Sequence, residues 1–379
     1  MDGRSIGDAM ARAGHEQVVF VADRASELRA VIAIHSTALG PSLGGIRFWR
    51  YPSEADAVRD VLALSEAMTY KAAVAELHQG GGKAVVMVDD PDAPRSEALL
   101  RALGRAIDEL GGRYIAAEDV GATTRDMDVI AEETPWVTGV AEERGGSGDP
   151  SPVTAVGVLH AMHAVCDEVF GDPSLRRRRV VVQGAGHVGA HLVALLRDAH
   201  ADVAVADVNT SRASAVADEH GAEVVEHEHV LEQECDVLAP CALGGVTSLE
   251  TVPRLRCRAI VGAANNQLTD PSVAGALAAR GIVYAPDFVV NAGGIINIAE
   301  EFTGYSRERA LKRAAAIGET TARVLRVARE RGVTPEDAAL ELARGRLRTE
   351  AVPGGHWRPG DPAAWTDGQP LRTLRPGHP

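Results

Sequence analysis

A glycine-rich turn between a strand and a helix constrains the fold of this chain most strongly. The apolar run at residues 180–183 is typical of a buried strand, and a G-x-G-x-x-G sequence at 184–189 follows it directly. A second apolar run, at residues 202–207, ends in an acidic residue 23 positions after Gly184. Strand, glycine turn, helix, strand and terminal acid in this order predict a βαβ dinucleotide-binding unit.

The three glycines and the terminal acid of this unit each have a predicted role in nucleotide binding. Gly184 would make the tight turn, Gly186 would let a pyrophosphate approach the helix N-terminus, and Gly189 would allow close packing of helix and strand. Asp207 would accept hydrogen bonds from the adenosine ribose and repel a 2′-phosphate, which favours NAD over NADP. The alternative is that Asp207 is a helix cap or turn residue, and Arg212, five residues on, would weaken the discrimination.

Two lysines, Lys71 and Lys83, form the second informative feature. Lys83 follows three consecutive glycines and precedes the apolar run at residues 84–88. Glycine lets a ligand or another backbone approach closely. A lysine held there would lose water, which lowers its pKa toward that of a useful general base. The alternative is a surface lysine after a flexible turn. The motif is not a P-loop, because Ala84 replaces the Ser or Thr that would hold Mg²⁺.

Composition limits the remaining function classes. The net charge of −14 argues against nucleic acid and anionic membrane partners. The N-terminus lacks the apolar stretch of a secretory signal, and no apolar run suggests a membrane span. The four cysteines show no C-x-x-C spacing, so neither a disulfide nor a metal site is expected. These features favour a soluble cytoplasmic enzyme.

The chain is long enough for two domains, and strands alternate with helices on both sides of a Gly/Pro/Ser-rich crossing at residues 145–152. We therefore predict an α/β protein. Residues 1–150, rejoined by 331–352, would form a mixed-sheet substrate-binding and oligomerisation domain. Residues 151–330 would form a Rossmann domain, with an active-site cleft between the two. Residues 353–379, which contain six Pro and five Gly, would be a flexible tail.

The whole pattern resembles the glutamate/leucine/phenylalanine/valine dehydrogenase family over about residues 15–345, and is most similar to the leucine and valine dehydrogenases. The segments that carry the resemblance are residues 40–47, 68–71, 80–83, 117–121, 150–155, 239–242, 264–268 and 291–294. The resemblance implies NAD-dependent, reversible oxidative deamination of a branched-chain L-amino acid (valine, leucine or isoleucine) to a 2-oxo acid, ammonia and NADH. It also implies a homo-oligomer.

The resemblance assigns roles to individual residues. Lys71 would pair with the substrate carboxylate, Lys83 would activate the attacking water, and Asp119 would move a proton to and from the substrate nitrogen. Backbone groups at Gly44 and Gly45 and the side chain of Asn291 would complete the contact with the carboxylate. The residues that would line the side-chain pocket are Leu43, Ala117, Thr321 and Val324. The cofactor contacts implied are Thr154, Gly184, Ala185, Gly186, His187, Val188, Gly189, Asp207, Ala239 and Asn265.

Leu43 stands where glutamate-specific relatives carry a lysine, so the resemblance implies an apolar side-chain pocket that disfavours a second carboxylate. A phenylalanine-type substrate remains an alternative. A second alternative is a catalytically weak relative that binds NAD as a sensor or subunit. It is suggested by Glu76, where leucine dehydrogenases usually have glycine and where a positive φ would strain glutamate. The alternative interpretation is that Glu76 points to solvent. A hydroxy-acid dehydrogenase would leave both lysines unexplained.

Overall fold

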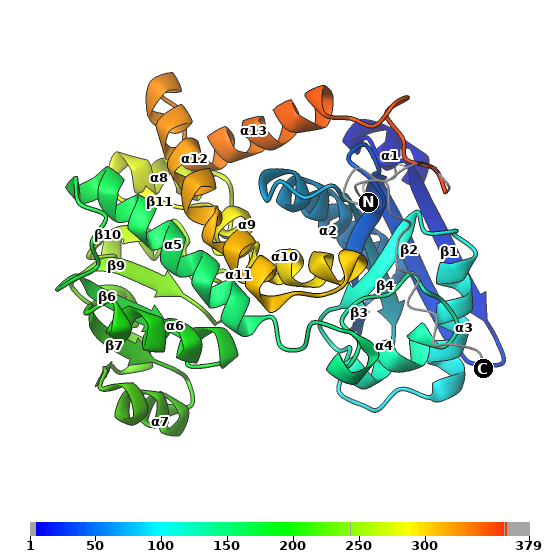
Figure 1. The fold of residues 1–379 in the computed structure, drawn as a ribbon, viewed down its shortest axis with the longest axis horizontal. Coiled ribbons are helices and arrows are strands. Elements are labelled where there is room, and N and C mark those ends of the chain that lie inside the picture. Colours follow the sequence, from blue (N-terminus) through cyan, green and yellow to red (C-terminus); the bar gives the residue numbers. More distant parts are fainter. Residues whose placement is uncertain (1–4, 243, 360, 362–379) are drawn as a thin grey trace. The chain divides into compact units, whose positions relative to one another are not determined.

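The computed structural model describes residues 5–242, 244–359 and 361, and the chain forms two compact units (Figure 1). The first unit comprises Met1–Gly148, Ile298–Ser306 and Ala343–Pro379, and the second comprises Asp149–Asn297 and Arg307–Leu342. The first crossing lies close to the predicted one. The chain also returns to the first unit at Ile298–Ser306, which the sequence did not suggest, and its last return falls at Ala343 rather than near residue 331.

The first unit is built on a mixed five-stranded sheet, which confirms the predicted sheet type. Its strand order is β1-β2-β4-β3-β5, with β1–β2 and β2–β4 antiparallel and β3 parallel to both β4 and β5. The strands are β1 (Gln17–Asp23), β2 (Leu28–Ser36), β3 (Ser42–Trp49), β4 (Gly80–Met87) and β5 (Tyr114–Glu118). The helices of this part are α1 (Ile6–Ala13), α2 (Glu54–Val74), α3 (Glu97–Asp108) and α4 (Thr124–Ala131).

Both faces of this sheet are buried. Alternate residues of β2 point to opposite sides, and each set packs against helices. Val31 packs with Val58 and Val61 of α2, whereas Ile32 belongs to the core that includes Leu103 of α3 and Met127 of α4. Helix α2 therefore covers one face, and α3 and α4 cover the other. This arrangement places the C-terminal turns of α2 against the glycines that open β4.

The second unit contains a parallel six-stranded sheet with the order β11-β10-β9-β6-β7-β8. Its strands are β6 (Arg179–Gln183), β7 (Asp202–Ala206), β8 (Glu223–Val224), β9 (Cys235–Pro240), β10 (Cys257–Ile260) and β11 (Val283–Tyr284). Numbered within the unit, this order is 3-2-1-4-5-6 reversed, the doubly wound order of dinucleotide-binding domains. The turn after β6 therefore lies at the point where the strand order changes direction.

Helices flank this second sheet. They are α5 (Ser151–Phe170), α6 (His187–Asp198), α7 (Thr210–His220), α8 (Ser272–Ala279), α9 (Asp287–Val290), α11 (Arg307–Ala315) and α12 (Ile317–Arg331). Two further helices, α10 (Gly293–Ala299) and α13 (Pro335–Thr349), each contain a boundary between the units. Within the described residues, α5 is the one helix long and apolar enough to cross a membrane. Half of it is buried and it packs against α6 and α12, as a core helix does.

Part of the predicted tail packs against the first unit. The Val352 N–H donates to the Ala38 carbonyl at 2.7 Å, and the Trp357 N–H donates to the Thr37 hydroxyl at 3.1 Å. The Trp357 side chain is only 2% exposed. The prediction of a flexible tail therefore does not hold for this segment, because a large aromatic side chain gains burial that its Pro/Gly-rich neighbourhood did not indicate. Residues 362–379 lie outside the described part.

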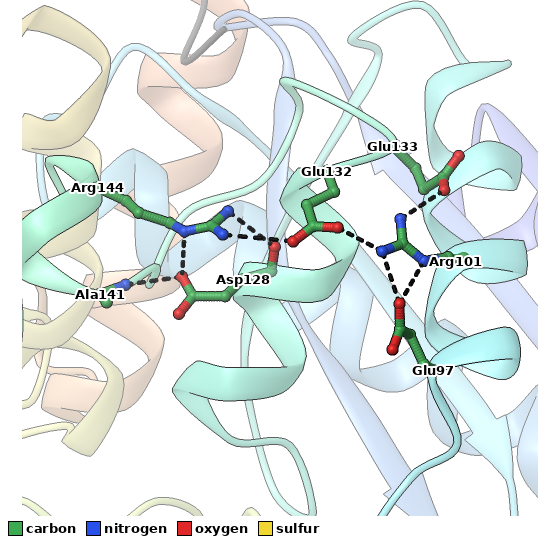
Figure 2. A network of polar contacts seen from close by, with 7 residues as sticks. All are labelled: Glu97, Arg101, Asp128, Glu132, Glu133, Ala141 and Arg144. Atoms are coloured by element: carbon green, nitrogen blue, oxygen red, sulfur yellow. Dashed lines mark hydrogen bonds and ion pairs between the residues drawn. The ribbon is translucent and has the colours of Figure 1, made fainter. Parts of the chain in front are cut away.

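An ion-pair network fixes the segment that leads to the first crossing (Figure 2). Arg101 of α3 binds Glu97, Glu132 and Glu133, and Arg144 binds Glu132 and the backbone carbonyl of Asp128. The Asp128 carboxylate also accepts a hydrogen bond from the Ala141 N–H at 3.1 Å. Shared carboxylates thus join α3, α4 and the turn at 142–144.

A buried carboxylate holds the other side of the same segment. Glu301, 2% exposed, accepts hydrogen bonds from the Ser147 N–H at 2.9 Å and from the Gly139 N–H at 3.2 Å. Burial raises the pKa of Glu301 to about 7, although these backbone donors oppose the shift. The carboxylate therefore ties the segment at 298–306 to the residues directly before the first crossing.

Glu301→Gln is expected to make stability less dependent on pH. The pKa of Glu301 in the folded protein, about 7, lies above its ordinary 4.5, so the folded state binds the extra proton. The wild-type protein should therefore lose stability as pH rises from about 5 to 8, by up to about 3 kcal/mol. Glutamine keeps a carbonyl acceptor and carries no charge. Denaturant unfolding at several pH values should show the variant gaining on wild type across this window; parallel curves would contradict the assignment.

Candidate active site

The three glycines before Lys83 let other backbone segments approach β4. A Cβ atom on Gly81 would lie 2.1 Å from the backbone nitrogen of Thr69 in α2, and one on Gly80 would lie 1.8 Å from the Ser36 carbonyl oxygen. On the neighbouring strand, a Cβ on Gly44 would lie 1.7 Å from the Gly82 carbonyl oxygen. Gly80 and Gly81 therefore lie against backbone atoms of other segments, whereas Gly82 lies against the side chains of Ser42 and Tyr114. These close contacts set the position of the strand that carries Lys83.

Lys83 and Asp119 form an ion pair inside the first unit. Lys83 lies in β4, Asp119 directly follows β5, and Lys83 Nζ is 2.7 Å from Asp119 Oδ2. Lys83 is 4% exposed, and burial lowers its pKa while the Asp119 charge opposes that change. Burial alone would raise the pKa of Asp119, but the positive charges of Lys83 and Arg47 lower it overall. The site therefore holds a carboxylate beside a lysine that gives up its proton more readily than usual.

Gly45 makes room for this pair. Its added Cβ would lie 2.5 Å from Asp119 Cβ and 3.2 Å from Lys83 Nζ, so a side chain there would displace Asp119 and crowd the Lys83 ammonium group. Gly45 aligns with Ala117 of β5 in the sheet, and Leu43, two residues earlier in β3, is fully buried. The structure thus brings together Gly45, Ala117, Lys83 and Asp119 from three adjoining strands and the turn after β5. Lys71 lies near the C-terminal end of α2 and is partly buried.

Three polar residues extend the site beyond the residues expected from the sequence. Arg47 of β3 contacts Asp119 and also Asp60 of α2, and the Tyr51 hydroxyl donates to Asp60. Arg47 stands two positions after Gly45, so strand periodicity would have placed it on the same face. No local signal in the sequence connects Asp60 or Tyr51 to this face, because both contacts depend on where α2 packs.

Glu76 adopts the left-handed conformation, with φ of 57°, and its side chain is exposed. Strain at this position, which the sequence analysis tied to a positive φ, is therefore present, because a left-handed backbone is unfavourable for residues with a Cβ. The exposed side chain agrees with the solvent-facing interpretation of Glu76. The residue that suggested the sensor alternative is thus an exposed carboxylate on a strained backbone.

Glu76→Gly is expected to raise the free energy of unfolding by about 0.5–1 kcal/mol, because glycine adopts φ of 57° without a Cβ clash. Denaturant titration of the two proteins measures the difference. Ala63→Gly, at an exposed position inside α2, is the matched control and should lose about 1 kcal/mol. A loss of stability in Glu76→Gly would show that the glutamate side chain stabilises this turn.

The glycine turn of the second unit joins β6 to α6. Gly184 has a φ of 108°, and a Cβ on Gly189 would lie 1.9 Å from the Gly184 carbonyl oxygen. Gly186 caps α6, and an added Cβ there would meet nothing within 4 Å. The turn therefore needs glycine for its conformation and for helix packing, and it leaves open space at the helix N-terminus. His187 is exposed at this end, 3.7 Å from the Asp149 carboxylate.

Asp207 takes part in the turn itself. It is 6% exposed, and its carboxylate accepts hydrogen bonds from the Ala185 N–H and the Asn209 N–H, both at 2.8 Å. Arg212 lies 3.7 Å from the same carboxylate. Asp207 is thus a turn residue in the structure, as the alternative interpretation states. Its carboxylate lies at the glycine turn, beside the Arg212 guanidinium.

Asn291 and Asn265 come together in the second unit. The Asn291 amide donates to Asn265 Oδ1 at 2.8 Å and to the Ala263 carbonyl at 3.1 Å. Within the part of the chain that the structure describes, the buried Asn291 Oδ1 has no hydrogen-bond partner. Thr154, Ala239, Thr321 and Val324 are buried, and the Thr321 hydroxyl donates to the Ile317 carbonyl within α12. The Thr321 hydroxyl thus has its hydrogen-bond acceptor within its own helix.

The fold and these residues together define an α/β oxidoreductase with a dinucleotide-binding unit and a buried lysine paired with a half-buried aspartate. The chain belongs to the Glu/Leu/Phe/Val dehydrogenase family and is an amino acid dehydrogenase. The model for the "Glu/Leu/Phe/Val dehydrogenase, dimerisation domain" matches residues 15–136. The model for "Glutamate/Leucine/Phenylalanine/Valine dehydrogenase" matches residues 145–224 and 205–351.

Individual relatives agree with this assignment. The chain is 48% identical to a leucine dehydrogenase of Thermoactinomyces intermedius over 90% of this chain and 93% of that protein. It is 49% identical to a valine dehydrogenase of Streptomyces virginiae over 88% of this chain and 94% of that protein. Among solved structures, the L-tryptophan dehydrogenase of Nostoc punctiforme superimposes with a TM-score of 0.82 at 39% identity, covering 91% of this chain and 99% of that one.

Proposed function

We propose that the protein catalyses NAD-dependent, reversible oxidative deamination of branched-chain L-amino acids. The observation that carries the proposal is the pair formed by the buried Lys83 and the half-buried Asp119 at 2.7 Å, which supplies a base and a proton carrier side by side. The leucine and valine dehydrogenases that align over about nine-tenths of the chain support the substrate class. Deamination needs both groups, because one proton leaves the nitrogen and another leaves the attacking water.

The first unit would bind and transform the substrate. Lys71 would pair with the carboxylate as a point charge, together with backbone groups at Gly44 and Gly45. Hydride loss from the substrate Cα leaves an imine. Lys83 would accept a proton from the water that attacks this imine and, once protonated, would stabilise the negative charge that develops. Asp119 would carry protons to and from the departing nitrogen, so that ammonia and a 2-oxo acid are released.

The second unit would bind NAD, which accepts the hydride. Gly186, open at the N-terminus of α6, suits a pyrophosphate, and the residues proposed to surround it are Ala185, His187, Val188 and Thr154. Asn291 Oδ1 is a buried acceptor, so it suits an N–H donor such as a carboxamide better than the carboxylate first expected there. Asp207, beside the turn, disfavours a 2′-phosphate, while Arg212 at 3.7 Å reduces that preference.

The substrate side chain would meet an apolar surface. Leu43 is fully buried and Ala117 is 3% exposed, so neither offers a countercharge to a second carboxylate. Leaving a carboxylate buried without a partner costs several kcal/mol, which excludes glutamate as a good substrate. A branched aliphatic side chain fits small apolar residues. The 39% identity to an L-tryptophan dehydrogenase favours an aromatic amino acid as the second candidate substrate.

A substrate panel tests the function. NADH formation at alkaline pH would be measured with L-valine, L-leucine, L-isoleucine, L-phenylalanine, L-tryptophan and L-glutamate, with NAD and NADP in parallel. We expect turnover on the branched-chain amino acids with NAD, and little with glutamate or NADP. A higher kcat/KM for tryptophan or phenylalanine would favour the second candidate, and NAD binding without turnover on any amino acid would overturn the proposed activity.

We further propose that the protein is a cytoplasmic homo-oligomer. Its net charge of −14 argues against nucleic-acid and anionic membrane partners. Strand β1 lies at an edge of the first sheet and exposes Phe20 by 47%. Exposed edge strands with a large apolar residue are suited to pairing with a second copy. Light scattering after gel filtration would show an oligomer that Phe20→Lys weakens; a monomeric wild type would overturn this proposal.

A further inference from the structure

Arg47 and Lys83 share one oxygen of the Asp119 carboxylate. Arg47 Nε donates to Asp119 Oδ2 at 3.1 Å, and Lys83 Nζ lies 2.7 Å from the same atom. A single negative charge therefore faces two cationic groups. The guanidinium of arginine does not lose its proton in proteins, whereas a desolvated lysine does. If one of the two groups becomes neutral, it is Lys83.

Asp60 holds Arg47 from the opposite side. Arg47 Nη1 donates to Asp60 Oδ2 at 3.1 Å, and the Tyr51 hydroxyl donates to that same oxygen at 2.6 Å. Arg47 belongs to β3 and Asp60 to α2, so the sheet and the covering helix both fix the guanidinium. Ion pairs with two carboxylates offset more of the side-chain entropy that Arg47 loses in this orientation than either pair alone.

We propose that Arg47, anchored by Asp60, neutralises Asp119 and thereby leaves Lys83 able to give up its proton and act as the base. This inference rests on the proposed function of Lys83 and Asp119 and assigns Arg47 a positioning role. It touches no reacting atom in this arrangement. It acts through Asp119, because a carboxylate without a second cation would hold Lys83 as an ammonium ion.

The charges around Lys83 act in opposite directions. Burial is the largest cause that lowers the pKa of Lys83, and Arg47 lowers it further, whereas Asp119 and, more weakly, Asp60 raise it. Tyr114 of β5 donates its hydroxyl to the Gly44 carbonyl, and burial raises its pKa well above the ordinary value, so it stays neutral. Burial likewise raises the pKa of Tyr51. Lys71, the remaining lysine of the first unit, lies on α2, and this further cation is left unchanged in all the variants below.

Two substitutions should therefore move the pH dependence in opposite directions. Arg47→Met removes a charge that lowers the pKa of Lys83, so the acidic limb of the kcat/KM profile should move to higher pH by about one unit. This means about tenfold lower kcat/KM on the limb, recovered at higher pH. Asp60→Asn removes a charge that raises that pKa and keeps one carbonyl oxygen, which Arg47 and Tyr51 can share as they share Oδ2 of Asp60, so the limb should move slightly to lower pH.

Further variants separate this effect from loss of structure. Arg47→Lys restores a cation and should return the limb part of the way toward wild type. Arg59→Met is the matched control, because Arg59 pairs with Asp56 on the exposed surface of the same helix as Asp60, and it should leave the limb where it is. A merely structural role of Arg47 would lower kcat/KM equally at all pH values. A limb that stays fixed in Arg47→Met and Asp60→Asn, or moves the same way in both, would overturn the inference.

A second readout does not depend on turnover. Of the 39 Lys and Arg residues only Lys71, Lys83 and Lys312 are lysines, so protein grown with ¹³C-labelled lysine gives few Cε signals. The Lys83 signal, identified by its absence in Lys83→Arg, should titrate at higher pH in Arg47→Met and at lower pH in Asp60→Asn. If wild type turns over no amino acid, the proposed function fails, and this titration still decides the role of Arg47.

Discussion

Lys83→Ala is expected to lower kcat for amino acid deamination by about 10³–10⁴-fold, because it removes both the base and the positive charge that the reaction needs. The fold should tolerate the change for two reasons. Lys83 is 4% exposed, so removing it also removes the cost of burying its charge, and Arg47 remains to pair with Asp119. NADH formation at saturating substrate measures the loss, and tryptophan fluorescence or calorimetric titration with NAD checks that the second unit still binds the cofactor.

The matched control for Lys83→Ala is Lys312→Ala, at an exposed position of α11 in the second unit. It should retain wild-type kcat. Equal activity of Lys83→Ala and wild type across pH 7–10 would show that another group serves as the base. A loss confined to KM would instead show that Lys83 binds the substrate without taking part in the chemistry.

Gly81→Ala is expected to reduce the free energy of unfolding by about 3 kcal/mol or more, or to prevent folding. The added Cβ would lie 2.1 Å from the Thr69 backbone nitrogen and 2.2 Å from its hydroxyl oxygen, so α2 or β4 has to move. Lys71 and Lys83 lie two residues from these contacting positions on α2 and β4, so activity should fall with stability. Denaturant unfolding and the NADH assay measure the two effects.

Gly275→Ala serves as the control for Gly81→Ala. Gly275 lies inside α8, and a Cβ there would meet nothing within 4 Å. Alanine is the better helix former, so this variant should gain about 0.5–1 kcal/mol. A stability of Gly81→Ala as high as that of Gly275→Ala would mean that the close approach of α2 to β4 is readily relaxed, and that Gly81 serves some purpose other than packing.

Much of the fold follows from short stretches of sequence. The strand, the G-x-G-x-x-G turn and the acid at Asp207 lie within about thirty residues, and local backbone preferences select such a βαβ unit. The mixed first sheet and the two-unit division also follow from alternating strands and helices around the crossing near residue 148. The return at Ile298–Ser306 and the burial of Glu301 and Trp357 do not, because they depend on packing between segments far apart in sequence.

The candidate site divides in the same way. The sequence by itself identified Lys71, Lys83 and Asp119 as the candidate groups for amino acid deamination, because the motifs that carry the family resemblance are local. Only the tertiary structure decided that Arg47 shares Asp119 with Lys83, that Asp60 of α2 anchors Arg47, and that Gly80 and Gly81 lie against backbone of other segments. Strand register and helix placement bring such side chains together, and neither is encoded in any single segment.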